Sequence, residues 1–321
     1  MAKREALQPG VVISVVGPTA SGKTEVAIAL AQKLHTEIVN ADARQIYRGM
    51  SIGTAQPTAE ERHAIPHHFV DFLSPNELYS AGAFEKAAVP QLTNLCSTYG
   101  SAVLAGGSGM YVKATLQGLD ELPSDADLRE ELNAKVQDGG LPSLVAQLQK
   151  LDAKHAANMD TSNPQRVVRA LEVCITSGQP FSSFHTGKAK TRPWHVVSIG
   201  LQPDREELRK RIAKRAHAMI KAGWLEETRA LLPHRDTNAL NTLGYKELFQ
   251  HLDGSMGIEE AMELVITRTY QFAKRQMTWF QKDPNTMWFA YEANNREQKL
   301  SEAVEHAISK FGHLQGKPLL Q

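Results

Sequence analysis

Short apolar runs alternate with amphipathic stretches along the first third of the chain. The apolar runs predict strands at residues 11–16, 37–40, 68–72 and 101–105, and a later run predicts one at 196–201. The spacing of apolar residues between the runs predicts helices, notably over 25–34 and 80–97. Strands that alternate with helices indicate an α/β fold with a parallel sheet and helices on both faces. Ligands of such sheets bind beyond the carboxyl ends of the strands.

The pattern changes after residue 119. Residues 120–192 show helical periodicity, and Gly139-Gly140 and Asn163-Pro164 divide them into several helices. The strand predicted at 196–201 returns the chain to the sheet, and beyond it we expect only helices. The sequence therefore predicts a core domain built from residues 1–119 and 193–321, and a mostly helical insertion domain at 120–192.

Composition narrows the function classes only slightly. The 321 residues include 36 Lys+Arg and 35 Asp+Glu, so the global charge favours no particular partner. Two distant cysteines, Cys96 and Cys174, give neither a disulfide framework nor zinc-ligand spacing. No stretch approaches the ~20 apolar residues of a membrane helix. We therefore expect a soluble, cytoplasmic protein without a membrane partner, and a monomer. Locally, residues 186–230 hold eleven basic residues against five acidic ones, which is typical either of a solvated face or of a phosphate-binding one.

A glycine-rich loop follows the first predicted strand. Its spacing is G-x-x-x-x-G-K-[ST], which predicts a cradle for a di- or triphosphate, as in proteins that bind nucleotides such as ATP. Lys23 supplies a charge, and the Thr24 hydroxyl can bind Mg²⁺. The pattern does not say whether a phosphate is transferred or pyrophosphate leaves. The predicted diphosphate-binding residues of the loop are Gly17, Pro18, Thr19, Ala20, Ser21, Gly22, Lys23 and Thr24.

Two further strand ends carry polar groups. Asp42 follows the second strand, where it could hold Mg²⁺ through water, accept a proton, or cap a helix. Gly106-Gly107-Ser108-Gly109 follows the fourth strand, where many ATP hydrolases have an acid, and this weakens an ATPase assignment. The Ser108 hydroxyl could donate to a leaving-group oxygen, or the segment could be a plain turn.

Cationic residues recur at three later places. Arg166 and Arg169 share one side of a helix that opens at Asn163, which suits either a solvated face or a fork for phosphate or a base edge. Residues 268–280 mix cations and rings on a helix, a pattern that also suits single-stranded nucleic acid. We expect a stripe on that helix to pack in the core and Lys274 and Arg275 to lie off it; the stripe consists of Phe272, Gln276, Trp279 and Phe280. Residues 244–246 form another loop-to-helix turn.

In order and spacing, these segments resemble the bacterial tRNA dimethylallyltransferases, also called tRNA isopentenyltransferases. The resemblance spans roughly residues 11–283. Its most specific segments are 17–24, 42–47, 49–55, 106–111, 163–169, 244–246 and 273–280. It implies a P-loop-type core, a helical insertion that closes on the tRNA anticodon stem-loop, and transfer of a dimethylallyl group from dimethylallyl diphosphate to N6 of adenosine 37. The loop would then hold a leaving pyrophosphate.

The resemblance also assigns roles to residues. It implies that Asp42 is the general base and that Ser108, where the family usually has threonine, lies beside the reacting groups. Lys23, Thr24 and Arg215 match diphosphate-binding positions, with Thr24 near Mg²⁺. Ala43 departs from the family's usual serine. The tRNA-contacting positions would be Asp42, Ala43, Arg44, Gln45, Arg129, Gln165, Arg166, Val167, Val168, Arg169, Gly244, Tyr245, Lys246, Lys274, Arg275 and Gln276.

Two other functions fit part of the sequence. A P-loop small-molecule kinase that uses ATP and magnesium would explain the glycine-rich loop, but not the long helical insertion. A non-catalytic RNA-binding protein would explain the arginines, but intact Lys23, Thr24 and Asp42 count against it.

Overall fold

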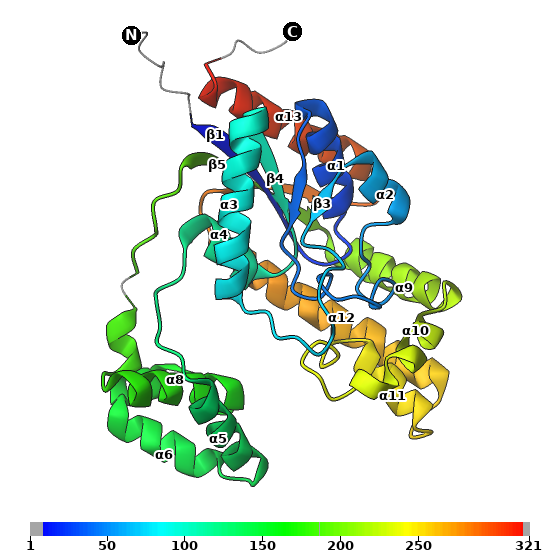
Figure 1. Cartoon of the computed structure of the whole chain (residues 1–321). Helices are drawn as coiled ribbons and strands as arrows, with labels where there is room; N and C mark the ends of the chain where they lie inside the picture. Colours follow the sequence, from blue (N-terminus) through cyan, green and yellow to red (C-terminus); the bar gives the residue numbers. More distant parts are fainter. Residues whose placement is uncertain (1–8, 186, 317–321) are drawn as a thin grey trace, which may run out of the picture. The chain divides into compact units, whose positions relative to one another are not determined.

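The core of the protein is a parallel sheet covered by helices on both faces (Figure 1). The computed structural model describes residues 9–185 and 187–316. Within these ranges six strands pair in the order β3-β2-β4-β1-β5-β6, and every pairing is parallel. The strands are β1 Gly10–Val16, β2 Ile38–Asn40, β3 His67–His68, β4 Ser101–Ala105, β5 Trp194–Pro203 and β6 Thr286–Tyr291. The predicted α/β class with a P-loop-type parallel sheet is confirmed.

The chain divides into two compact units. One comprises Met1–Gln117 and Thr191–Gln321, and the other comprises Gly118–Lys190. The sequence predicts the junctions at 119–120 and 192–193, within a few residues of these positions. No helix among the described residues is long and apolar enough to cross a membrane.

Alternate residues of the central strand β1 face opposite layers of helices, as the two-residue repeat of a strand requires. Val11, Ile13 and Val15 are buried against α1 (Lys23–Leu34) and α13 (Arg296–Leu314). Val12 and Val16 are buried with residues of α3 (Ala81–Tyr99) and α4 (Gly109–Gln117) on the other face. This two-sided core fixes the sheet edge from which the glycine-rich loop emerges.

A third apolar cluster supports the segment that follows β2. Ile46, Tyr47 and Met50 are buried against later helices of the same unit. Figure 1 shows these helices together, in yellow-green to orange. They are α9 Arg205–Lys221, α10 Trp224–Ala230, α11 Tyr245–Leu252 and α12 Ile258–Phe280, with a 3₁₀ turn at Leu232–His234; a short helix, α2 Ala59–Ala64, precedes β3.

The inserted unit is helical, with its own core. Leu132, Leu144, Leu148 and Leu171 are buried there together. Its elements are α5 Ala126–Gln137, α6 Leu141–Leu151, α7 Ala153–Asn158, α8 Pro164–Ser177 and a 3₁₀ helix, Phe181–Phe184.

Two predicted elements differ from the structure. The strand predicted at 68–72 ends at His68, because Phe69 and Asp71 adopt φ values of 62° and 56°, which no strand allows. The purely helical C-terminal region predicted from the sequence is wrong, because β6 lies at Thr286–Tyr291 beside β5. The residues of β6 from Met287 to Tyr291 form a continuous apolar run, as do those of the predicted strands.

Candidate active site

The glycine-rich loop wraps the amino end of α1. Gly17 and Gly22 have φ values of 145° and 92°, in the region that favours glycine. A Cβ at Gly17 would also lie 2.7 Å from the Leu201 carbonyl oxygen, so the close approach of β5 requires glycine here. Lys23 folds back over the loop and donates from Nζ to the Pro18 carbonyl at 2.7 Å. The loop therefore presents a cation and a helix amino terminus on one side, which suits an anion.

A cavity of about 540 Å³ opens beside this loop. Its wall includes Asp42 and Gln45 after β2, Gly106 and Gly107 after β4, and cationic residues of α9. From the predicted site the cavity brings together Thr19, Ala20, Ser21, Gly22, Lys23, Thr24, Asp42, Gln45, Arg215 and Gln276. Segments far apart in sequence thus converge at the carboxyl ends of parallel strands, as expected for this class of sheet.

The two carboxylate oxygens of Asp42 have different surroundings. Oδ1 accepts the backbone N–H groups of Arg44 at 2.9 Å and of Gln45 at 3.4 Å, which holds the turn after β2. Oδ2 takes no part in these bonds, and it lies 3.6 Å from the position that a Cβ would occupy at Gly107. Asp42 therefore stabilises a turn through one oxygen, where no helix begins, and its other oxygen remains for a proton-accepting role.

Ser108 shapes the backbone next to Asp42. Its Oγ accepts the N–H of Ala43 at 2.8 Å, so the hydroxyl oxygen fixes the residue that follows Asp42. Ala43 takes part through its backbone alone, which serine at this position would do equally well. Ser108 is half-buried and keeps its hydroxyl proton for a further acceptor.

Cations of α9 reinforce the cradle. Arg215 donates to the Thr19 hydroxyl, and Arg211 donates from Nε to the Ala20 carbonyl at 2.7 Å. Lys214 lines the same cavity. Sequence reasoning selected only Arg215, although the spacing of Arg211 and Arg215 places them on one helix face and could have identified both.

Burial changes the protonation of Lys23. Its pKa falls from 10.5 to about 8, because desolvation and, to a smaller extent, the charge of Arg215 outweigh the opposing effect of Asp42. The same desolvation lowers the pKa of Arg215. Burial destabilises the charged forms of Lys23 and Arg215. A bound anion stabilises these charged forms, so such a site favours anion binding.

On α12 the structure corrects several expectations. Gln276 is buried, as expected for the stripe, and its amide is bonded to Thr19 and Gly107, which argues against the tRNA contact that the resemblance implies. Phe272 and Trp279, expected in the core, are each 38% exposed, whereas Phe280 is buried as expected. Cations lie over aromatic rings along this helix and just after it: the pairs are Lys274 with half-buried Tyr270 at 6.0 Å, Arg275 with Phe272 at 5.9 Å and Lys282 with Trp279 at 5.9 Å. Lys274 and Arg275 thus remain available to an external partner, and Gln276 does not.

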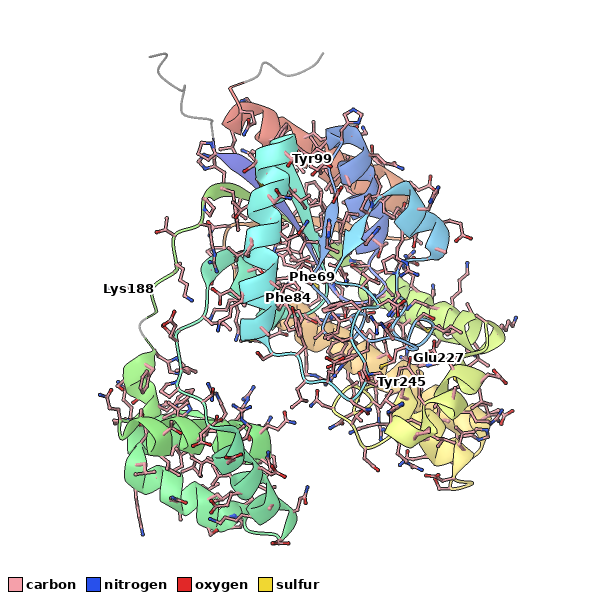
Figure 2. All side chains as sticks on the ribbon, viewed as in Figure 1. Phe69, Phe84, Tyr99, Lys188, Glu227 and Tyr245 are labelled. Atoms are coloured by element: carbon pink, nitrogen blue, oxygen red, sulfur yellow. The ribbon has the colours of Figure 1, made fainter. Side chains whose placement is uncertain are left out.

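The turn at residues 244–246 is largely structural. Tyr245 is fully buried, and its hydroxyl donates to Glu227 at 2.6 Å (Figure 2). The Glu227 carboxylate also accepts the N–H groups of Ile52 at 2.8 Å and Gly53 at 2.9 Å, so Tyr245 and Glu227 together hold the segment after β2. The prediction that the Tyr245 side chain contacts tRNA is therefore wrong. Of the other two residues of this turn, Lys246 is exposed, and Gly244 has a φ of 88° where the chain turns.

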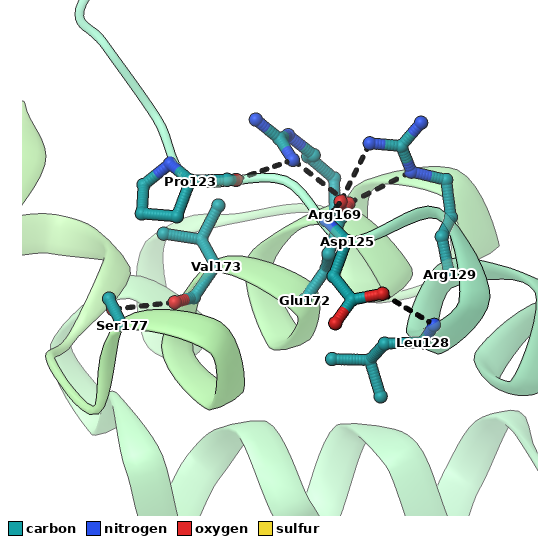
Figure 3. Close-up of polar contacts among 8 residues, drawn as sticks. All are labelled: Pro123, Asp125, Leu128, Arg129, Arg169, Glu172, Val173 and Ser177. Carbon is teal, nitrogen blue, oxygen red and sulfur yellow. Dashed lines mark hydrogen bonds and ion pairs between the residues drawn. The ribbon is translucent and has the colours of Figure 1, made fainter.

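In the inserted unit, a buried carboxylate organises two of the predicted arginines. Glu172 is 0% exposed and accepts two bonds from Arg129, at 2.9 and 2.7 Å. Arg169 pairs with the same carboxylate at 2.9 Å, and the Asp125 N–H donates to it at 2.9 Å (Figure 3). Burial raises the pKa of Glu172, but these hydrogen bonds outweigh it and leave the pKa below its ordinary value. Arg129 and Arg169 are thereby held side by side and remain partly exposed.

The remaining predicted residues of α8 fall into two groups. Gln165 and Arg166 are exposed at the start of the helix. Val167 and Val168 are buried in the core of the inserted unit, so the prediction that their side chains contact tRNA is wrong. Their apolar side chains already indicate burial in the sequence, whereas the resemblance assigns the whole segment 165–169 to tRNA.

Comparison with known proteins places the chain in a family. A sequence model described as IPP transferase matches residues 45–283. The tRNA dimethylallyltransferase of Christiangramia forsetii is 44% identical over 285 residues, covering 88% of this chain and 94% of that protein. The one from Cytophaga hutchinsonii is 43% identical over 279 residues, covering 87% and 92%.

Solved structures agree with this placement. The full-length tRNA isopentenylpyrophosphate transferase of Bacillus halodurans matches with a TM-score of 0.71 and 34% identity, covering 96% of this chain and 98% of its own. A eukaryotic dimethylallyltransferase acting on tRNA shares the fold, with a TM-score of 0.80 at 24% identity, over 97% of this chain and 81% of its own. The chain belongs to the IPP transferase family.

Proposed function

We propose that this protein transfers a dimethylallyl group from dimethylallyl diphosphate to N6 of adenosine 37 in tRNA and releases pyrophosphate. The observation that carries the proposal is that the anion cradle and Asp42 line one cavity of about 540 Å³. The names of the relatives support the same reaction. A carboxylate base serves phosphoryl transfer as well, where it accepts the proton of an attacking hydroxyl, so the names of the relatives are what favour alkylation over the kinase alternative.

The proposed reaction assigns a role to each part of the cavity. The N6 nitrogen attacks the first carbon of the dimethylallyl group, the bond from that carbon to the diphosphate oxygen breaks, and pyrophosphate leaves with the electron pair. Asp42 accepts the proton that N6 loses. Lys23, Arg215 and the backbone of the loop stabilise the negative charge that develops on the leaving oxygen.

The donors at the loop fit a magnesium ion held mainly by the diphosphate. The Thr24 hydroxyl is exposed at the cavity, and Asp42 lies in the same wall. Among the described residues, no cluster of three or more His, Cys, Asp or Glu side chains could hold a metal. Mg²⁺ characteristically binds through few protein oxygens together with phosphate oxygens and water. When bound, the ion would neutralise charge on the diphosphate.

The tRNA substrate would bind through cations on both units. In the core unit Lys246, Lys274 and Arg275 are exposed, and in the inserted unit Arg166 is exposed while Arg129 and Arg169 are held as a pair. We assign these residues to the phosphates of the anticodon stem-loop, with adenosine 37 turned out of its stack to reach Asp42. The protein would act as a monomer in the cytoplasm.

One experiment separates this function from the kinase alternative. Unmodified tRNA with adenosine at positions 36–38 is incubated with the protein, dimethylallyl diphosphate and Mg²⁺, and its nucleosides are analysed by mass spectrometry. Gain of a dimethylallyl group on one adenosine supports the proposal. Phosphate release from ATP, with no modified nucleoside, would favour the kinase.

A further inference from the structure

Gln276 lies between two loops on which the proposed reaction depends. Its side chain is 7% exposed. Oε1 accepts the backbone N–H of Thr19 in the glycine-rich loop at 2.8 Å, and Nε2 donates to the Gly107 carbonyl at 2.8 Å. A primary amide combines one acceptor and two donors in a rigid plane, so this single side chain joins both loops in one geometry.

The helix that carries Gln276 packs closely on the loop after β4. A Cβ at Gly107 would lie 2.6 Å from Gln276 Nε2, and a Cβ at Gly109 would lie 2.1 Å from the Trp279 ring. Both glycines therefore permit the contact with α12. A Cβ at Gly107 would also lie 3.6 Å from Asp42 Oδ2, so the amide and the proposed base are both close to the same residue.

At the glycine-rich loop, Gln276 fixes a strained segment. Ala20 has a φ of 64°, a conformation that costs a non-glycine residue about 1 kcal/mol or more and persists only when its surroundings hold it. Gln276 holds the preceding residue by its N–H, and Arg215 donates to the hydroxyl of that residue, Thr19. Loss of the amide would therefore release both the loop backbone and the partner of Arg215.

We propose that Gln276 is a positioning residue of the diphosphate site, a role that rests on the proposed function. It sets the Thr19–Ala20 backbone and Arg215 for the diphosphate, and it holds Gly107 beside Asp42. Its burial separates it from its exposed neighbours Lys274 and Arg275, which have no such bonds to the loops among the described residues. Two other roles are possible in principle, a direct tRNA contact and a purely structural link between α12 and the sheet.

The test is Gln276→Met, which keeps the length of the side chain and removes both hydrogen bonds. Binding of dimethylallyl diphosphate with Mg²⁺, and of tRNA, is measured separately, together with the KM for each substrate. We expect the Kd and KM for the diphosphate to rise about tenfold, as for the loss of two neutral hydrogen bonds, and the Kd for tRNA to change less than twofold. Gln298→Met, at an exposed glutamine on α13, is the matched control and should change neither.

Gly107→Ala perturbs the same contact at Gly107 instead of at Gln276. The new Cβ displaces the Gln276 amide, so this variant should also weaken diphosphate binding, and the two losses should not add in the double variant. An unchanged diphosphate Kd in both variants would overturn the proposal in favour of a structural link, and a raised tRNA Kd alone would favour a tRNA contact. The Kd for pyrophosphate can also be compared between the variants and the unmodified protein, and this comparison does not require transfer to tRNA. Failure of the proposed function would therefore be distinguished from failure of the role proposed for Gln276.

Discussion

The lowered pKa of Lys23 leads to a quantitative prediction for ligand binding. In the proposed site the diphosphate binds the charged form of Lys23, so its affinity for the free protein should depend on the fraction of Lys23 that is protonated. With a pKa of about 8, that fraction falls from about nine-tenths at pH 7 to about one-tenth at pH 9. The Kd for dimethylallyl diphosphate should therefore rise about tenfold between pH 7 and pH 9, and binding should take up protons in this range.

Calorimetry without tRNA measures this effect directly, because no transfer occurs. The ligand contributes little, since a terminal phosphate titrates near pH 6, about two units below the lysine. Lys23→Arg provides the control: a guanidinium stays charged throughout, so its Kd should be nearly flat from pH 7 to pH 9 even if it is weaker overall. A flat profile for the unmodified protein, or the same slope in Lys23→Arg, would refute the argument that Lys23 is desolvated and contacts the diphosphate.

Four further outcomes follow from the structure. Lys23→Met should raise the melting temperature of the ligand-free protein at pH 7, and its advantage over the unmodified protein should shrink from pH 8 to 10.5, because unfolded Lys23 binds a proton there that folded Lys23 has lost; calorimetric scans that show a constant difference would contradict this. Asp42→Ala should lower kcat by roughly two to four orders of magnitude in a transfer assay while the tRNA Kd stays within twofold. Glu172→Gln should lower the free energy of unfolding by about 1–3 kcal/mol in urea titrations and weaken tRNA binding, since Arg129 and Arg169 lose their shared carboxylate. Lys274→Ala should reduce the slope of log K for tRNA against log salt by about 1, and an unchanged slope would place this lysine outside the tRNA interface.

Local patterns predicted the parts of the fold and site that depend on short segments. The apolar runs of β1, β4 and β5 and the spacing of residues 17–24 define strand, loop and helix within a few residues, so their placement needed no tertiary information. Asp42 was identifiable because the carboxyl ends of parallel strands meet at one edge of the sheet. The alternative in which Asp42 caps a helix is wrong, because the residues that follow it form a turn, although Oδ1 does hold that turn.

The remaining features depend on contacts between distant segments. Helix periodicity predicts that Gln276 faces inward, but it does not reveal the partners of the amide, because Gly107 lies more than 100 positions away in the sequence. Tyr245 belongs to a segment that the family resemblance assigns to tRNA, and only its packing shows that it is buried. Glu172 carries no motif of its own, and only the fold shows that it collects two arginines. The edge strand β6 differs from these cases, because Met287–Tyr291 is an apolar run like those of the predicted strands and could have been identified from the sequence.

The most direct test of the proposed function is a stoichiometry. In a single turnover with dimethylallyl diphosphate, Mg²⁺ and unmodified tRNA, pyrophosphate released and dimethylallyl groups gained by adenosine 37 are quantified together. The proposed mechanism predicts one pyrophosphate for each modified adenosine, and loss of both products in Asp42→Ala. Pyrophosphate release without modification of the tRNA, or equal turnover by Asp42→Ala, would contradict it.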